Sequence, residues 1–250
     1  SYNKLSVVSH YYPTPSNDTI ISYQDIYPRD YYTPFSYQSD YERRYREQSL
    51  LERAVNYVVA NSPVPTDLDI DMDNDGKVDN VCFVVDGWCF AWGELLWPHK
   101  GTLNDRYVYI NGKRVWDYTI MLSGAGSTYF NTSVFCHEMF HTLGAPDLYR
   151  YNNSTLDPSA YPVGQWDLMA NTHNPPQHMG AYMKWRYGNW IDSIPTITQP
   201  GTYTLHSLGD STYDNCCYKI ATQHPNQWYV LEYRDNTELF ETTLPGKGLL

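Results

Sequence analysis

Residues 136–147 read Cys136-His137-Glu138-Met139-Phe140-His141-Thr142-Leu143-Gly144-Ala145-Pro146-Asp147, which is the pattern His-Glu-x-x-His-x-x-Gly-x-x-Asp. His141 follows His137 by four positions, so on a helix both imidazoles project from one face, a turn apart. At this spacing one ring nitrogen of each histidine can reach the same zinc ion at about 2.0–2.1 Å. The pattern therefore predicts a metal-binding helix.

The residues around the two histidines fit a catalytic zinc site. Glu138 follows the first ligand, where its carboxylate can hold a metal-bound water and take its proton. Gly144 can end the helix in a left-handed conformation that most residues avoid. The chain would then turn back sharply and offer Asp147 as a third ligand.

The alternative is an amphipathic helix whose histidines are ordinary core or surface residues. From average residue usage, His-Glu-x-x-His arises by chance in roughly one chain in a hundred of this length. The glycine and aspartate at the following spacings reduce that frequency by about a hundredfold. We therefore adopt the zinc interpretation.

An acidic run at 69–79 is a second candidate metal site. Alternate carboxylates followed by glycine at the sixth position are typical of an oxygen-rich calcium loop. The ligands predicted in this register are Asp71, Asp73, Asp75 and Asp79. The pattern departs from an EF-hand because its twelfth position is Cys82 and not glutamate. The alternative is a solvated acidic turn in front of a strand.

The remaining elements follow from apolar periodicity. We expect helices over 40–60 and 178–187, and strands over 5–10, 81–85 and 118–122. Asn111-Gly112 predicts a type I′ hairpin between strands at 107–110 and 113–116. Beyond residue 191, alternating Thr, Tyr and Val predict short strands that include Tyr203 and Leu205, Tyr218 and Ile220, and Trp228 to Leu231.

This change in the residue pattern suggests an approximate domain boundary near Asp192. We expect one domain over residues 1–191 and a β-rich C-terminal segment over residues 192–250. We also expect sequence to be missing on both sides. Ser1 does not resemble a natural start, and we expect a mature or trimmed product because processing removes targeting segments. At the other end, the sequence stops where a strand is expected to begin.

Composition excludes several classes of protein. The chain has 250 residues, of which 42% are hydrophobic, as in a globular protein. A net charge of −11 argues against a nucleic-acid partner, because no basic stripe is available to displace counterions. No apolar run approaches the roughly 18–20 residues of a transmembrane helix.

The five cysteines do not form a recognisable framework. Their number is odd and no Cys-x-x-Cys is present, which disfavours zinc ribbons and thioredoxin-like motifs. Cys82 and Cys89 could close a short loop, while the adjacent Cys216 and Cys217 could be free and buried.

Several segments, in order, resemble the secreted zinc metallopeptidases related to bacterial immune inhibitor A. The resemblance spans nearly the whole chain, although only residues 137–147 are diagnostic by themselves. The other segments are Ser1-Tyr2-x-Lys4-Leu5, Asp73-x-Asp75-Gly76-x-Val78-Asp79, Leu96-Trp97-Pro98-His99, Leu148-Tyr149, Trp166-Asp167-Leu168-Met169, Gly201-Thr-Tyr-Thr-Leu205 and Leu244-Pro-Gly-x-Gly-Leu249.

The resemblance implies an α+β, metzincin-like (zincin) catalytic domain. Such a domain has a twisted mixed sheet, an active-site helix beneath the cleft and a methionine-bearing turn under the zinc. By resemblance the zinc ligands are His137, His141 and Asp147, the general base is Glu138, and the methionine of the turn is Met169. Related families use histidine at the third ligand position or take a glutamate from a separate helix.

The leading functional hypothesis is a secreted zinc endopeptidase with protein or peptide substrates. We expect the strand at 118–122 to form the cleft edge, where an extended peptide adds by backbone hydrogen bonds. One alternative is a catalytically weak, calcium-stabilised extracellular binding module of the same fold. Another is a zinc hydrolase acting on non-peptide bonds. The intact Glu138 favours an enzyme over the binding module.

Overall fold

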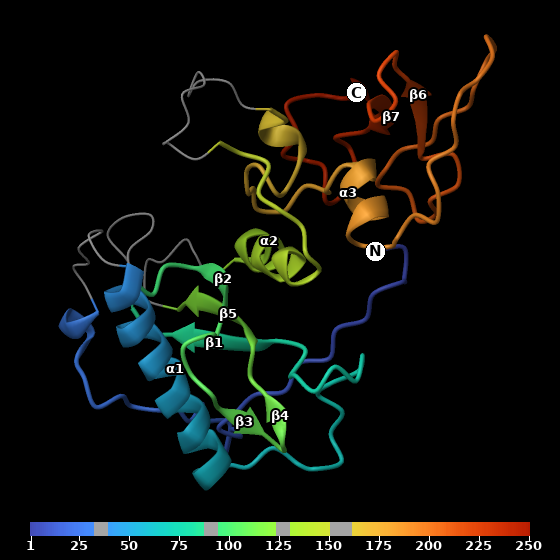
Figure 1. The fold of residues 1–250 in the computed structure, drawn as a ribbon. Coiled ribbons are helices and arrows are strands. Elements are labelled where there is room, and N and C mark those ends of the chain that lie inside the picture. Colours follow the sequence, from blue (N-terminus) through green and yellow to red (C-terminus); the bar gives the residue numbers. More distant parts are fainter. Residues whose placement is uncertain (33–39, 88–94, 124–130, 151–161) are drawn as a thin grey trace. The chain divides into compact units, whose positions relative to one another are not determined.

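A computed structural model describes residues 1–32, 40–87, 95–123, 131–150 and 162–250 (Figure 1), with only the backbone of Asp40 and Arg43. The elements form a few helices and several small sheets, which confirms the α+β class. The helices are the 3-10 helices η1 (Arg29–Tyr31) and η2 (Gly164–Trp166) and the α-helices α1 (Asp40–Asn61), α2 (Thr132–Thr142) and α3 (Ala181–Arg186). The strands are β1 (Val81–Val85), β2 (His99–Thr102), β3 (Tyr109–Ile110), β4 (Lys113–Arg114), β5 (Asp117–Leu122), β6 (Cys217–Ala221), β7 (Trp228–Arg234) and β8 (Gly248–Leu249).

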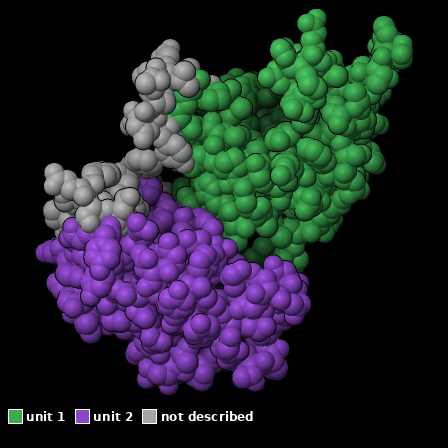
Figure 2. Space-filling view, viewed as in Figure 1, with its two compact units in different colours: residues 1–7, 131–250 green, residues 8–130 purple. Residues whose placement is uncertain are grey.

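The chain divides into two compact units (Figure 2). Unit 1 comprises residues 1–7 and 131–250, and unit 2 comprises residues 8–130. The boundary expected near Asp192 falls inside unit 1, so the β-rich C-terminal residues belong to the same unit as helix α2.

Unit 2 contains a three-stranded mixed sheet of order β1-β5-β2. Strand β1 runs parallel to β5, with Val81 opposite Tyr118, and β2 runs antiparallel to it, with His99 opposite Ile120. The prediction that residues 118–122 form a cleft edge is wrong. Strand β5 is paired on both sides and buried from Tyr118 to Leu122, so it has no open edge to receive a peptide.

Helix α1 confirms the helix predicted over 40–60. Its apolar residues Leu50, Leu51 and Val55 are buried in one core cluster with Tyr118 and Ile120 of β5. This cluster gives the helix and the sheet of unit 2 a shared core, because each buries its apolar face against the other.

The predicted hairpin forms between β3 and β4. Asn111 and Gly112 both have positive φ, 49° and 81°, as a type I′ turn requires. The end of the acidic run lies beside this hairpin. Val78 donates its N–H to the Arg114 carbonyl at 2.9 Å, and Arg114 donates to the Gly76 carbonyl at the same distance. The hairpin therefore fixes one side of the acidic loop.

The strand expected over residues 5–10 does not form. These residues have no strand partner in the part of the chain that the structure describes, and Val8 is 76% exposed. Tyr203 and Leu205 likewise lie outside every described strand. In both places β-propensity alone is insufficient, since a strand is stabilised by its neighbours.

Unit 1 contains α2, α3 and the antiparallel sheet β6-β7-β8. Helix α3 and strands β6 and β7 fall where the sequence predicts a helix and strands. Cys216 and Cys217 are buried and not disulfide-bonded, whereas Cys89 lies outside the described residues. Over the described ranges, no helix has both the length and the apolar character needed to cross a membrane.

Candidate metal centre

Helix α2, which carries His137, Glu138 and His141, begins at a side-chain cap. Asn131 has extended backbone angles, and its side chain accepts a hydrogen bond from the N–H of Val134 at 2.9 Å. This bond satisfies one of the amide groups that the first helical turn leaves without a partner. Asparagine is among the residues that are preferred at this position, because its short side chain can reach such an amide.

The helix ends at Gly144 as predicted. Gly144 has φ +89°, and its N–H donates to the His141 carbonyl at 2.9 Å. A Cβ at this position would meet nothing closer than 3.9 Å, so the glycine is required by its backbone angle and not by space. The left-handed residue reverses the chain and brings Asp147 back toward the helix.

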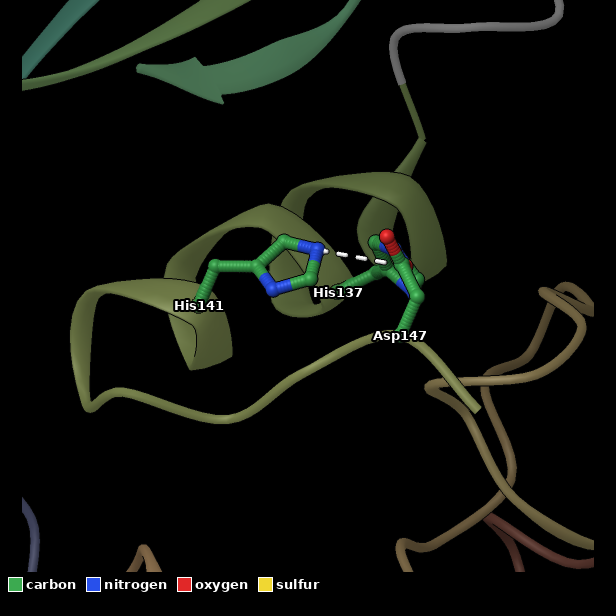
Figure 3. Close-up of side chains that lie close together, drawn as sticks. All are labelled: His137, His141 and Asp147. Carbon is green, nitrogen blue, oxygen red and sulfur yellow. Dashed lines mark ion pairs between the residues drawn. The ribbon is translucent and has the colours of Figure 1, made fainter. Parts of the chain in front are cut away.

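Three ligand atoms converge at this reversal (Figure 3). Nε2 of His137 lies 3.0 Å from Oδ1 of Asp147, and Nε2 of His141 lies 3.3 Å from the same oxygen. Tetrahedral zinc with ligands at about 2.0–2.2 Å separates them by about 3.3–3.6 Å, a range that the His141 separation meets and that the His137 separation falls short of by a few tenths of an ångström. The spacing of these atoms therefore fits three ligands of one small cation.

Backbone carbonyls orient both imidazoles. Nδ1 of His137 lies 2.9 Å from the Leu168 carbonyl oxygen, and Nδ1 of His141 lies 2.7 Å from that of Ala145. A carbonyl only accepts, so each Nδ1 carries a proton, and Nε2 of each ring faces the Asp147 carboxylate with a lone pair when the ring is neutral and with an N–H when it is protonated. Lone pairs facing a carboxylate repel it unless a cation or a proton lies between them, and this is the arrangement that metal-bound histidines adopt.

The same arrangement shifts the pKa of both histidines. Burial lowers the pKa of His137, but the hydrogen bond with Asp147, the charge of Glu138 and the Leu168 carbonyl outweigh it, so the pKa lies above its ordinary value. Burial also lowers the pKa of His141, and Asp147 with the Ala145 carbonyl again raises it by more. A metal ion at this place would therefore compete with a proton for the two Nε2 atoms.

Glu138 lies on α2 between the two ligands and is 8% exposed. Its negative charge contributes to the raised pKa of both His137 and His141, so the carboxylate acts on both rings. A carboxylate in this position can take a proton from a water molecule held beside the ligands.

Met169 lies in the hydrophobic core with Phe140 of α2 and Trp190. Its carbonyl accepts the N–H of Leu148, the residue after Asp147, at 2.8 Å. The turn predicted to carry the methionine therefore contacts the chain next to the third ligand.

The acidic run brings together three of the four predicted calcium ligands. Each of Asp71, Asp73 and Asp79 offers a carboxylate oxygen, and the three oxygens lie within 4.8 Å of one another. Asp75 does not join this group; its carboxylate accepts from the Lys77 ammonium and backbone N–H.

Lysine already partly balances the charge of this acidic group. Nζ of Lys113 lies 2.6 Å from Oδ2 of Asp71, and this hydrogen bond lowers the pKa of the Asp71 carboxyl. By contrast, burial and the neighbouring aspartates raise the pKa of Asp79. The structure thus offers oxygen ligands together with a competing ammonium group.

Sequence reasoning missed the groups that support the ligands. The carbonyls of Leu168 and Ala145 have no side-chain signature, so no pattern could reveal them. Tyr149, quoted only for the resemblance, has its ring nearly parallel to that of His137, with centroids 6.5 Å apart.

Neither protein-family models, curated proteins nor solved structures give a match to this chain. The function of the chain is therefore inferred from its own residues and their geometry.

Proposed function

We propose that this protein is a zinc-dependent endopeptidase of metzincin-like fold that acts outside the cell. The observation that carries the proposal is the convergence of two imidazole Nε2 atoms and one carboxylate oxygen at His137, His141 and Asp147. Two histidines and one carboxylate form a three-ligand set of the kind found in catalytic zinc sites, which leave a fourth position open. The resemblance of the sequence to secreted zinc metallopeptidases supports the fold and the extracellular location.

The residues have distinct roles in the proposed reaction. His137, His141 and Asp147 would hold the zinc, with Leu168 and Ala145 fixing the two rings. Bound zinc would lower the pKa of a water molecule and polarise the carbonyl of the peptide. Glu138 would take a proton from the attacking water and pass it to the leaving amine, which needs that proton to depart.

The proposed substrates are proteins or peptides, as the resemblance of the sequence to secreted zinc metallopeptidases implies.

A structural calcium ion in the acidic loop is also part of the proposal. Asp71, Asp73 and Asp79 would supply oxygen ligands, which calcium prefers, while Asp75 would stay paired with Lys77. The ion would replace the Lys113 ammonium as the partner of Asp71 and relieve repulsion among the carboxylates.

Glu138→Gln tests the proposed chemistry. The amide keeps the shape of the side chain but cannot take a proton, so casein cleavage should fall by at least about 100-fold. Metal analysis after dialysis should still find about one zinc per chain. Glu52→Gln, a glutamate of α1 in unit 2 that pairs with Arg106, is the matched control and should retain activity.

Undiminished cleavage by Glu138→Gln would contradict the proposed general base. A parent protein that binds zinc but cleaves no member of a peptide library would favour the binding module instead. A parent protein that retains no zinc would return residues 137–147 to an ordinary amphipathic helix.

A further inference from the structure

A cluster of charged side chains is buried in unit 1, away from the three metal ligands in sequence. Arg234 and Glu241 are fully buried, and Lys184, Asp167 and Glu232 are nearly so. Burying a charge is costly unless it is paired and hydrogen-bonded. The hydrogen bonds and ion pairs of this cluster therefore show which segments of unit 1 it connects.

Arg234 of β7 uses all five of its N–H groups. Nε and Nη2 donate to the two carboxylate oxygens of Glu241, both at 2.7 Å, and Nη1 donates to Glu232 at 3.0 Å. Two further bonds reach backbone carbonyls, from Nη1 to Trp166 at 2.7 Å and from Nη2 to His178 at 3.2 Å. The planar guanidinium can serve five acceptors in a fixed geometry, which a lysine cannot do.

The carboxylates of the cluster also accept hydrogen bonds from backbone N–H groups at the start of α3. Glu232 accepts the N–H of Ala181 at 2.5 Å, and Glu241 accepts that of His178 at 2.9 Å. Asp167 accepts the N–H of Gly180 with one oxygen and that of Met169 with the other, both at 2.7 Å. Arg234 and the three carboxylates thus hold the turn at 166–169 against residues 178–181.

The turn at residues 166–169 also contacts the candidate metal centre. Leu168, two residues after Trp166, supplies the carbonyl that orients His137. Met169 supplies the carbonyl that accepts from Leu148, directly after Asp147. A shift of this turn would therefore move two of the three ligands together.

We infer that Arg234 is a positioning residue for the zinc centre, an inference that rests on the proposed function. By holding the Trp166 carbonyl, it fixes the Leu168 and Met169 carbonyls and, through them, the orientation of His137 and the placement of Asp147. The C-terminal β-sheet then supports the zinc centre through Arg234, although none of the three proposed ligands lies in that sheet.

Arg234→Lys tests the inference in the full chain carrying Glu138→Gln, which prevents autolysis. Zinc affinity is measured by competition with a chromophoric chelator, well below the melting temperature and with folding checked by circular dichroism. Lysine keeps the charge but cannot serve five acceptors, so zinc should bind about 10–100-fold more weakly, as expected for loss of an outer-shell partner. The visible spectrum of the cobalt-substituted protein should change in the same variant.

Arg53→Lys is the matched control. Arg53 lies on α1 of unit 2 and forms a two-point ion pair with Asp25, with bonds of 2.8 and 2.9 Å. The Arg53→Lys variant should therefore have a lower melting temperature, with zinc affinity and the cobalt spectrum unchanged. If Arg234→Lys does not fold, Glu241→Gln replaces it, because the amide keeps the volume and one acceptor oxygen, and zinc should then bind several-fold more weakly.

Zinc affinity within twofold of the parent in a folded Arg234 or Glu241 variant would overturn the inference and leave Arg234 with a purely structural role. Equal weakening of zinc binding by Arg53→Lys would overturn it as well. A parent that binds no zinc would instead refute the proposed function, and the inference with it; the measurement on the parent separates this result from the others.

Discussion

Nε2 of His137 and Oδ1 of Asp147 lie 3.0 Å apart, although one belongs to helix α2 and the other to the loop that follows it. The left-handed residue Gly144 makes this contact possible by reversing the chain. The contact adds a carboxylate oxygen to the two imidazole nitrogens and so forms a candidate site with three metal ligands.

Asp147→Asn should weaken zinc binding by more than the roughly 10–100-fold that follows loss of an outer-shell partner. The amide is neutral and a poorer zinc ligand than the carboxylate that faces His137 and His141. Asp147→His should recover part of the affinity, because imidazole is itself a zinc ligand. Chelator competition measures both variants, and unchanged affinity in Asp147→Asn would exclude Asp147 as the third ligand.

Gly144→Ala should lower the free energy of unfolding by about 1–2 kcal/mol, the cost of a left-handed conformation for a residue with a Cβ. Zinc binding should weaken too, because the reversal places Asp147. Gly246→Ala is the control: its Cβ would lie in open space and its φ is not in the left-handed region, so stability should change by less than about 0.5 kcal/mol. Thermal unfolding gives both values, and equal effects would contradict the conformational argument.

Lys184 should make stability depend on alkaline pH. Burial, followed by the charge of Arg234, lowers its pKa from 10.5 to about 8. Between these values the unfolded chain binds more protons than the folded chain. The free energy of unfolding contributed by Lys184 therefore rises with pH, at up to about 1.4 kcal/mol per unit.

Urea unfolding of the parent and Lys184→Met from pH 7 to 10 measures this effect. The parent should gain stability relative to the variant above pH 8. Lys4→Met is the control: the hydrogen bond with Asp192 raises the pKa of the exposed Lys4 above 10.5, so both states hold its proton below pH 10. A parent-to-variant difference for Lys184 that stays constant with pH would contradict the prediction.

Calcium should raise the melting temperature through the acidic loop. At a concentration 100-fold above the dissociation constant, an ion that binds only the folded state adds about 2.7 kcal/mol. Lys113→Met should increase the calcium-dependent shift, because it removes the ammonium group that pairs with Asp71. Lys77→Met should change the shift less, because Lys77 pairs with Asp75, outside the group of three carboxylates. Melting curves in calcium and in chelator that coincide would identify an acidic turn balanced by Lys113.

The sequence alone was sufficient to predict those features that depend on only a few neighbouring residues. The two histidines share a helix face because of their spacing, Asn131 caps that helix, and Gly144 ends it. The Asn111-Gly112 turn likewise specifies its hairpin, because both residues accept positive φ without strain. In each case the residue responsible lies within a few positions of the helix end or turn that it specifies.

Tertiary structure decided the rest, because pairing and burial depend on residues far apart in the chain. Leu5 to His10 have β-propensity but no partner strand among the described residues, while β5 is placed between β1 and β2 and so has no open edge. The Leu168 carbonyl reaches His137 across a separation of 31 residues, and Arg234 reaches Trp166 across 68. The sequence by itself determined which residues stand at metal-binding spacing; the folded chain determined which of them come together, how they are oriented and what holds them in place.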